Sequence, residues 1–168
     1  GKRGIAIDAH SDLGRSVLHK LVARADVFVT NYRREALERM GLGHDELSAL
    51  NPRLVYARVS GFGPLGPDAD KAMLDGAAQA RSGVAAMSGP VDGPPMPPGA
   101  ALADHTGSMQ LALGVVTALF ARERTGRGQE VNTSSLGAMM WAQAWEIAMT
   151  GMASEPIARA GPHNPSIL

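Results

Sequence analysis

The residue best placed to perform chemistry is Asp104, which follows the apolar residues 100–103 and directly precedes a long stretch of helical periodicity. Aspartate is among the best N-cap residues, so capping of that helix is the simpler interpretation of the pattern. The same position also suits catalysis, because amide groups at a helix start stabilise negative charge that develops beside a carboxylate. Residues 106–108, Thr-Gly-Ser, are small enough to leave room for a bulky substrate. Capping and a catalytic role are therefore compatible.

Gly61, Gly63 and Gly66 have the G-x-G-x-x-G spacing of a dinucleotide-binding loop and follow an expected strand. Pro64 and Pro67 interrupt the place where a helix should begin with its amide groups directed at a pyrophosphate. The sequence also has no acidic residue that ends a clear second strand at the required distance. We therefore interpret this stretch as a Gly/Pro turn and not as an NAD site.

The other polar candidates have structural explanations. Three arginines, Arg122, Arg124 and Arg127, lie near the end of the long helical stretch, where exposed cations offset the negative end of a helix dipole. Four histidines lie in expected loops or on a polar helix face, without the spacing of metal ligands: His10, His19, His44 and His163. We expect no metal site.

The composition excludes several classes of protein. The 168 residues include 16 basic and 16 acidic side chains, so no net field attracts nucleic acid or an anionic membrane. Cysteine is absent, which excludes disulfides, thiolate metal sites and a cysteine nucleophile and fits a reducing compartment. Charges or glycines break every apolar run before the roughly 18 residues that a membrane span needs. We expect a globular, cytoplasmic protein with neither a nucleic-acid nor a membrane partner.

Short apolar or β-branched runs alternate with longer segments of helical periodicity, the pattern of β-α-β units around a parallel sheet. The sequence therefore predicts an α/β fold. Strands are expected at residues 4–8, 26–30, 54–60 and 130–134. Helices are expected at residues 11–24, 34–40, 44–50, 74–82, 105–124 and 136–149, with a Gly/Pro-rich loop at 88–98.

The two ends of the chain indicate a fragment. The sequence enters the apolar alternation of residues 4–8 at once, without an initiator methionine, and residues 161–168 are loop-like. We expect residues 1–150 to form part of one large domain and residues 151–168 to begin a linker towards a missing remainder.

Seven segments, in their order and spacing, resemble the class III coenzyme A transferase family. They are ADVFVTNYR at 25–33, LERMGLG at 37–43, LNPRLVY at 50–56, VSGFG at 59–63, DGAAQ at 75–79, GAALAD at 99–104 and RTGRGQ at 124–129. The resemblance covers nearly the whole chain, although complete members of the family are more than twice as long. It implies a Rossmann-like, three-layer α/β domain with a mainly parallel sheet, incomplete in this chain, and an interlocked homodimer in the complete protein.

The family resemblance also implies roles for individual residues. Asp104 inherits the position of the catalytic aspartate, which accepts the acyl group. Eight positions inherit contacts with coenzyme A, namely Asn31, Tyr32, Arg33, Arg39, Lys71, Ala72, Met73 and Leu74. Among them, Arg39 and Lys71 are suited to hold phosphate oxygens by charge-assisted hydrogen bonds. Acyl-CoA and a free carboxylic acid would be the substrates, and no cofactor would be bound permanently.

The implied reaction is CoA transfer through an aspartyl-CoA thioester. An ionised carboxylate needs no general base before it attacks a thioester. Many relatives have Tyr or Phe where this chain has Leu74, and the racemases of the same family have a catalytic histidine there. Racemase chemistry at the α-carbon of an acyl-CoA is the alternative reaction, and a non-catalytic CoA-binding domain is the alternative of another class. The family's glycine-rich covering loop lies outside the sequence, so we expect the fragment alone to be inactive.

Overall fold

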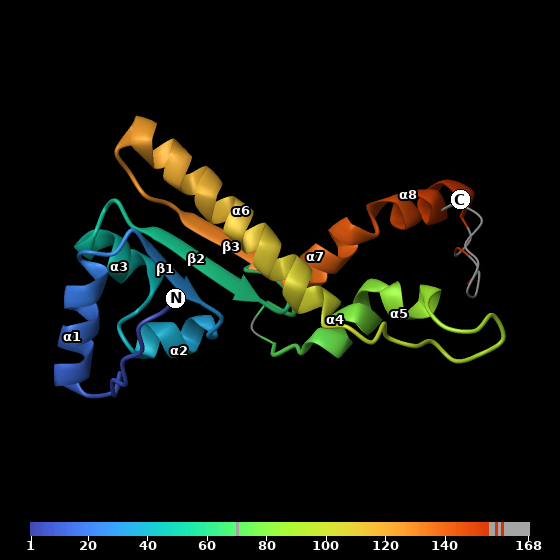
Figure 1. Ribbon diagram of the computed structural model, residues 1–168, viewed down its shortest axis with the longest axis horizontal. Coiled ribbons are helices and arrows are strands. Elements are labelled where there is room, and N and C mark those ends of the chain that lie inside the picture. The colour runs from blue at the N-terminus through green and yellow to red at the C-terminus, as the bar shows by residue number, and fades with distance from the viewer. Residues whose placement is uncertain (70, 155–156, 158, 160–168) are drawn as a thin grey trace. The chain divides into compact units, whose positions relative to one another are not determined.

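The computed structural model describes residues 1–69, 71–154, 157 and 159, and it has a mixed α/β architecture (Figure 1). Most of the expected linker at residues 151–168 lies outside the described residues, and so does His163. In chain order, the elements are α1 (Asp12–Val22), β1 (Val27–Thr30), α2 (Arg34–Arg39), α3 (His44–Leu50), β2 (Val55–Ser60), α4 (Asp75–Ser82), α5 (Val84–Met87), α6 (Leu102–Thr125), β3 (Glu130–Ser134), α7 (Ser135–Ala142) and α8 (Ala144–Ala153).

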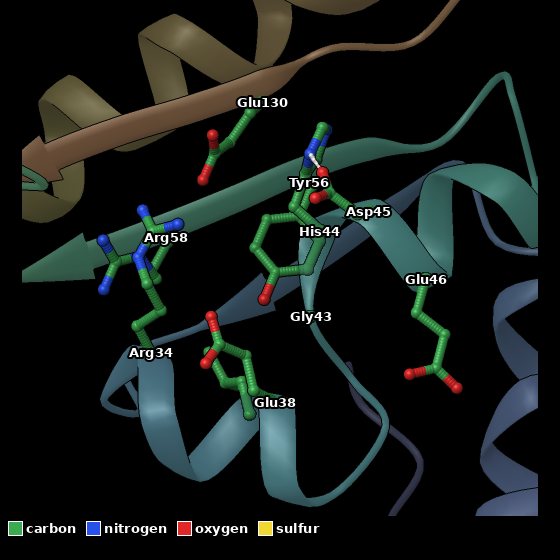
Figure 2. A pocket seen from close by; sticks show the side chains of 10 residues that line it. Arg34, Glu38, Gly43, His44, Asp45, Glu46, Tyr56, Arg58 and Glu130 are labelled. Carbon is green, nitrogen blue, oxygen red and sulfur yellow. Dashed lines mark hydrogen bonds and ion pairs between the residues drawn. The ribbon is translucent and has the colours of Figure 1, made fainter.

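The sheet has the strand order β1-β2-β3, and it confirms the predicted α/β class and three of the predicted strands. β1 pairs with β2 in parallel, with Val27 opposite Val55 and Thr30 opposite Arg58. β3 runs in the same direction along the other side of β2 (Figure 2). Because β2 is the central strand, its residues 55–58 are all buried.

The strand predicted at residues 4–8 does not form, and this prediction is wrong. Residues 1–8 have no regular structure, and Ile5 is 69% exposed. An isolated apolar alternation cannot make a strand without a neighbour to satisfy its amide and carbonyl groups, and β1 is the last strand on this side of the described sheet. The carbonyl of Asp8 instead accepts hydrogen bonds from the amide and the hydroxyl of Ser11, the N-cap of α1.

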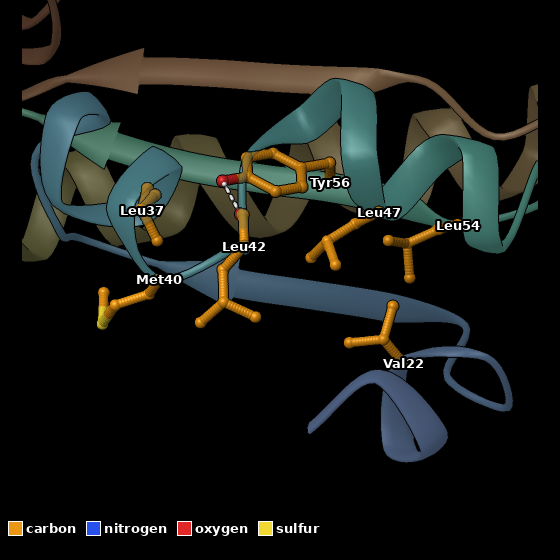
Figure 3. Packing of buried hydrophobic residues seen from close by; sticks show 7 residues of the cluster. All are labelled: Val22, Leu37, Met40, Leu42, Leu47, Leu54 and Tyr56. Carbon is orange, nitrogen blue, oxygen red and sulfur yellow. Dashed lines mark hydrogen bonds between the residues drawn. The ribbon is translucent and has the colours of Figure 1, made fainter. Parts of the chain in front are cut away.

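The described chain forms two compact units, each of which has its own core. The first unit comprises Gly1–Arg58 and Leu111–Asn132, and the second contains the rest. The core of the first unit is made of large apolar side chains from α1, α2, α3, β2 and the segments that connect them (Figure 3), namely Val22, Leu37, Met40, Leu42, Leu47, Leu54 and Tyr56. The hydroxyl of Tyr56 donates to the carbonyl of Leu42 at 2.9 Å, so its polar group is satisfied in this core.

Arg122 shows how the first unit connects α6 to the sheet. It is 8% exposed, and its guanidinium donates to the Asp26 carboxylate at 2.9 Å and to the Arg53 carbonyl at 3.0 Å. The prediction of a solvated arginine at the helix end is therefore wrong for Arg122, whereas Arg124 and Arg127 are exposed as expected. The periodicity of α6 could not reveal these acceptors, because they are 69 and 96 residues away along the chain.

The core of the second unit is smaller and more polar. Its fully buried apolar cluster consists of Ala78, Ala103 and Met139. Gln143 is 4% exposed and donates to the carbonyl of Ser82 at 2.6 Å. The single helix predicted at 136–149 is divided at Gln143 into α7 and α8, because this residue leaves the helical conformation at φ −116° and ψ 29°.

The helix predicted at 105–124 extends over Leu102–Thr125 as α6 and is the longest of the described helices. None of the helices in the described ranges combines the length and the apolarity that a membrane crossing requires.

Candidate active site

Asp104 is the third residue of α6 and not its N-cap, so the capping interpretation is wrong. The helix begins three residues earlier than predicted, at Leu102. Asp104 is exposed, whereas Ala103 and Gly107 beside it are buried. The side chain of Asp104 is therefore open to solvent, whereas the neighbouring residues Ala103 and Gly107 are buried in the second unit.

The acceptor at the start of α6 is Asp75, the first residue of α4. Its Oδ1 atom accepts hydrogen bonds from the amides of Ala103 at 2.8 Å and Asp104 at 3.1 Å. This arrangement satisfies amide groups that a helix start otherwise leaves without an intrahelical partner. A charged acceptor at this end also offsets the positive end of the helix dipole.

The neighbouring amides of α6 are occupied as well. The amide of Leu102 donates to the carbonyl of Ala100 at 2.8 Å, and that of His105 donates to the carbonyl of Ala101 at 3.0 Å. The expectation that helix-start amides stabilise charge beside Asp104 is therefore not met by residues 102–105, because each of these amides already has an acceptor.

Gln79 holds Asp75 from the side opposite the helix amides. Its Nε2 atom donates to Asp75 Oδ2 at 2.5 Å and to the carbonyl of Ala100 at 2.9 Å. Gln79 is 1% exposed, and its Oε1 atom has no hydrogen-bond partner in the described part of the chain. Both oxygens of Asp75 are thus engaged in a half-buried polar network that ends at the main chain of Asp104.

Gly107 has a packing role that the sequence did not show. It is buried, and a Cβ atom built at this residue would lie 3.9 Å from side-chain atoms of Ala138 and Val59. At that distance a Cβ atom would make ordinary van der Waals contact, so the first turns of α6 pack against α7 at a normal separation. The expectation that residues 106–108 leave room for a substrate stays a prediction.

The glycine-rich segment after β2 is a turn, as predicted. Gly63 and Gly66 have φ angles of 94° and 97°, a region that residues with a side chain rarely adopt. The amide of Gly63 donates to Ser60 Oγ at 3.1 Å. Residues 61–69 contain no helix, so the segment lacks the helix start that binds a pyrophosphate in a dinucleotide site.

The segment 71–74 approaches α4 in the second unit. Lys71 Nζ pairs with Asp68 Oδ1 at 2.5 Å, and Arg81 pairs with the other oxygen of Asp68 at 2.9 Å. The hydrogen bond from Lys71, reinforced by the charge of Arg81, lowers the pKa of Asp68. Lys71 is exposed and Leu74 is 83% exposed, so both remain accessible beside the polar network of Asp75.

The other predicted CoA contacts follow β1 in the first unit. Tyr32 is 58% exposed, and its amide donates to Thr30 Oγ1 at 3.1 Å. Asn31 and Arg33 flank it in the same exposed turn, and Arg33 is the N-cap of α2. Arg39 is the exposed last residue of α2. Ala72 is exposed in the second unit, and Met73 is half-buried there.

Sequence reasoning missed a pocket of about 260 Å³ in the first unit (Figure 2). Its lining includes Arg34, Glu38, Tyr56, Arg58 and Glu130. Arg58 is 4% exposed and donates to Asn132 Oδ1 at 3.3 Å. Burial raises the pKa of Tyr56 to about 12. The available sequence signal for this pocket was Arg58 within the apolar run of β2, because a buried arginine needs polar surroundings.

A comparison with protein-family models decides the family. The model described as CoA-transferase family III matches residues 1–168. The chain belongs to this family. Within the described residues, no group of three or more His, Cys, Asp or Glu side chains is arranged to hold a metal ion.

Curated relatives of this family III chain include a formyl-CoA:oxalate CoA-transferase from Rhodopseudomonas palustris (strain HaA2), 41% identical over 133 residues. That match covers 79% of the chain and 31% of the relative. An acetyl-CoA:oxalate CoA-transferase from Acetobacter aceti is 38% identical over 135 residues, covering 80% of the chain and 35% of the relative. The chain thus spans about a third of the length of these relatives.

Solved structures support the same assignment. A CAIB/BAIF family protein from Brucella suis superposes with a TM-score of 0.94 at 32% identity, over 98% of the family III chain and 44% of that protein. Rv3272 from Mycobacterium tuberculosis superposes with a TM-score of 0.84 at 29% identity, over 89% of the chain and 41% of that protein.

Proposed function

We propose that the complete protein transfers coenzyme A from an acyl-CoA thioester to a free carboxylic acid, with Asp104 as the nucleophile. The observation that carries this proposal is the exposed carboxylate of Asp104 at the start of α6, in a chain that the family model matches throughout. An aspartate at an open position with a fixed main chain combines access for a thioester with a defined direction of attack.

The proposed cycle has four steps. An oxygen of Asp104 attacks the donor thioester carbonyl, the C–S bond breaks, and a mixed anhydride and CoA thiolate form. The thiolate attacks the anhydride at the Asp104 carbonyl and releases the donor acid, leaving an aspartyl-CoA thioester. The acceptor carboxylate attacks this thioester, the C–S bond breaks, and a second anhydride and CoA thiolate form. The thiolate finally attacks the acceptor carbonyl, which gives the new acyl-CoA and restores the Asp104 carboxylate.

The anhydride intermediates require exclusion of water, since they would otherwise hydrolyse. Asp104 is exposed in the described chain, which spans about a third of its curated relatives. We therefore propose that further parts of the protein cover the site and that the fragment alone is inactive. An interlocked homodimer in a cytoplasmic, reducing compartment belongs to the same proposal.

Eight residues are proposed to contact CoA: Asn31, Tyr32, Arg33, Arg39, Lys71, Ala72, Met73 and Leu74. Arg39 and Lys71 supply exposed cations for phosphate oxygens. The pairing of Lys71 with Asp68 means that a phosphate must compete with this carboxylate. Leu74 has no group that transfers a proton, so it cannot serve as the second acid/base of a racemase.

The relatives suggest the first substrates to test. Formyl-CoA and acetyl-CoA are suitable donors and oxalate is a suitable acceptor, because the curated relatives are named for these compounds. A mass-spectrometric screen of acceptor acids would then define the preference of this protein.

The decisive experiment replaces Asp104 with Asn in the complete protein and measures thioester exchange. We expect loss of at least about a thousandfold in turnover, because an amide is not a nucleophile in this reaction. Asp12→Asn is the matched control, since Asp12 is also an exposed acid in the first turn of a helix. Near-normal exchange by Asp104→Asn would show that Asp104 is not the nucleophile.

A further inference from the structure

Both oxygens of the Asp75 carboxylate accept hydrogen bonds, although the residue lies at the start of a helix where an acid often faces only water. Its Oδ1 atom accepts two amides of α6, and one of them is the amide of Asp104 itself. Its Oδ2 atom accepts from Gln79. The first two of these hydrogen bonds join the first turn of α4 to the first turn of α6, although the two turns lie 28 residues apart in sequence, and the third lies within α4.

The buried amide of Gln79 determines the orientation of this carboxylate. Gln79 is 1% exposed, so its side chain has little space in which to change conformation. It donates both to Asp75 and to the carbonyl of Ala100, which precedes α6. Gln79 thereby contacts the two groups that enclose the helix start, Asp75 on one side and the residue 100 carbonyl on the other.

The network acts on Asp104 through its main chain. The side chain of Asp104 does not need to contact Asp75 for this effect, because the hydrogen bond to Asp75 comes from the amide nitrogen of Asp104. The amide position and the helical conformation together define where the Cα–Cβ bond points. A frayed first turn would let the carboxylate sample many positions and lose the geometry for attack.

We propose that Asp75 is a positioning residue for the reaction: it holds the first turn of α6 through the amides of Ala103 and Asp104 and so sets the direction in which the Asp104 carboxylate attacks. Gln79 orients Asp75 for this task. This inference rests on the proposed function, in which Asp104 forms the covalent intermediate.

The test separates the rate of the covalent step from the amount of folded enzyme. The complete protein is mixed with formyl-CoA or acetyl-CoA in single-turnover, acid-quenched reactions without an acceptor acid. Mass spectrometry then measures how fast the adduct on Asp104 forms and what fraction of the protein finally carries it. A positioning role slows the rate, whereas partial unfolding lowers only the final fraction.

For Asp75→Ala, we expect adduct formation to slow by about 10- to 100-fold, because misplacement of a reacting group by about 1 Å can cost about 100-fold. The final fraction of adduct and the KM for acyl-CoA should stay within about twofold of the wild type, since Asp75 acts through the main chain and not through CoA. Asp75→Asn retains an oxygen that accepts the two amides but directs an NH2 donor at the Gln79 Nε2 donor, so it should restore the rate only to within about tenfold of the wild type.

Asp12→Ala is the matched control, because it removes an exposed acid from the first turn of α1 and should leave the rate unchanged. A wild-type rate in Asp75→Ala would overturn the positioning role, as would a reduced final fraction with an unchanged rate. If the wild type exchanged CoA without any adduct on Asp104, the proposed nucleophile would be wrong and the positioning role would fall with it. If the wild type formed the adduct but Asp75→Ala formed it equally fast, the proposed function alone would stand.

Discussion

The two units of the chain reach a defined structure by different means. The first unit buries large apolar side chains, among them Leu47 and Tyr56, between its helices and the central strand. The second unit has a small apolar cluster and relies on the buried amides Gln79 and Gln143 to connect its segments. Apolar contacts are non-directional, whereas hydrogen bonds require particular angles.

This difference corresponds to what each unit does. The first unit supplies a sheet framework whose stability comes from burial. The second contains Asp104, the proposed nucleophile, and its polar network reaches the Asp104 amide. Hydrogen-bond networks favour one geometry of the residues they join, and they are costly when one member is lost.

The largest effect on stability is expected for Leu47→Ala in the first unit. Leu47 is fully buried, and such truncations cost about 2–5 kcal/mol because they leave a cavity. Chemical denaturation combined with hydrogen exchange in α3 and β2 would measure the loss. Leu65→Ala is the control, because Leu65 is 85% exposed and should change stability by less than about 0.5 kcal/mol. Similar costs for the two variants would contradict the role assigned to this core.

In the second unit, Gln143→Met should lower stability, although glutamine and methionine side chains have similar volumes. The variant leaves the carbonyl of Ser82 without its donor, which we expect to cost about 1–3 kcal/mol. Hydrogen exchange in α4 and α7 would locate the effect. Gln129→Met, at an exposed residue of the first unit, is the matched control. A neutral Gln143→Met would mean that apolar packing alone holds this unit together.

Alkaline pH should weaken the first unit through Tyr56. Burial raises the pKa of Tyr56 to about 12, so the folded state keeps its proton where the unfolded state, with a pKa near 10, releases it. The stabilising contribution is therefore complete below about pH 10 and is lost as the pH rises towards 12, with a slope of at most about 1.4 kcal/mol per pH unit. Denaturation at pH 8 and pH 11 should show a smaller alkaline loss in Tyr56→Phe than in the wild type.

Tyr32→Phe is the control for this experiment, because Tyr32 is 58% exposed. It should reproduce the alkaline loss of the wild type. An identical pH dependence in Tyr56→Phe and the wild type would assign the effect to other groups.

The smallest expected effect concerns Asp68 in the second unit. Its pKa is lowered by the hydrogen bond from Lys71, so its stabilising contribution is present above the unfolded pKa near 4 and is lost as the pH falls through the folded value. Asp68→Asn should flatten the stability curve slightly below about pH 4, since exposed ion pairs contribute little. Acid titrations of this variant and of Asp92→Asn, a control at an exposed loop residue, would measure the difference. A steeper loss of stability at acid pH in Asp68→Asn than in the wild type would contradict the lowered pKa of Asp68.

Local sequence patterns determined most of the framework. The apolar runs at β1, β2 and β3, the amphipathic α1 and the Gly/Pro turn after β2 were predictable, because each follows from the preferences of neighbouring residues. The order of the motifs also indicated the family that the whole-chain match then established. The assignment of CoA contacts to Asn31, Arg39 and Lys71 remains a prediction.

Tertiary structure decided the features that depend on distant partners. Residues 4–8 have the alternation of a strand but lack a paired neighbour in the described sheet, and Arg122 is buried because its acceptors come from other segments. The sequence by itself determined that Asp104 stands at the start of a long helix. Only the folded chain showed that Asp75 and not Asp104 accepts the amides of that helix start, because a hydrogen bond between residues 29 positions apart leaves no local signal in the sequence.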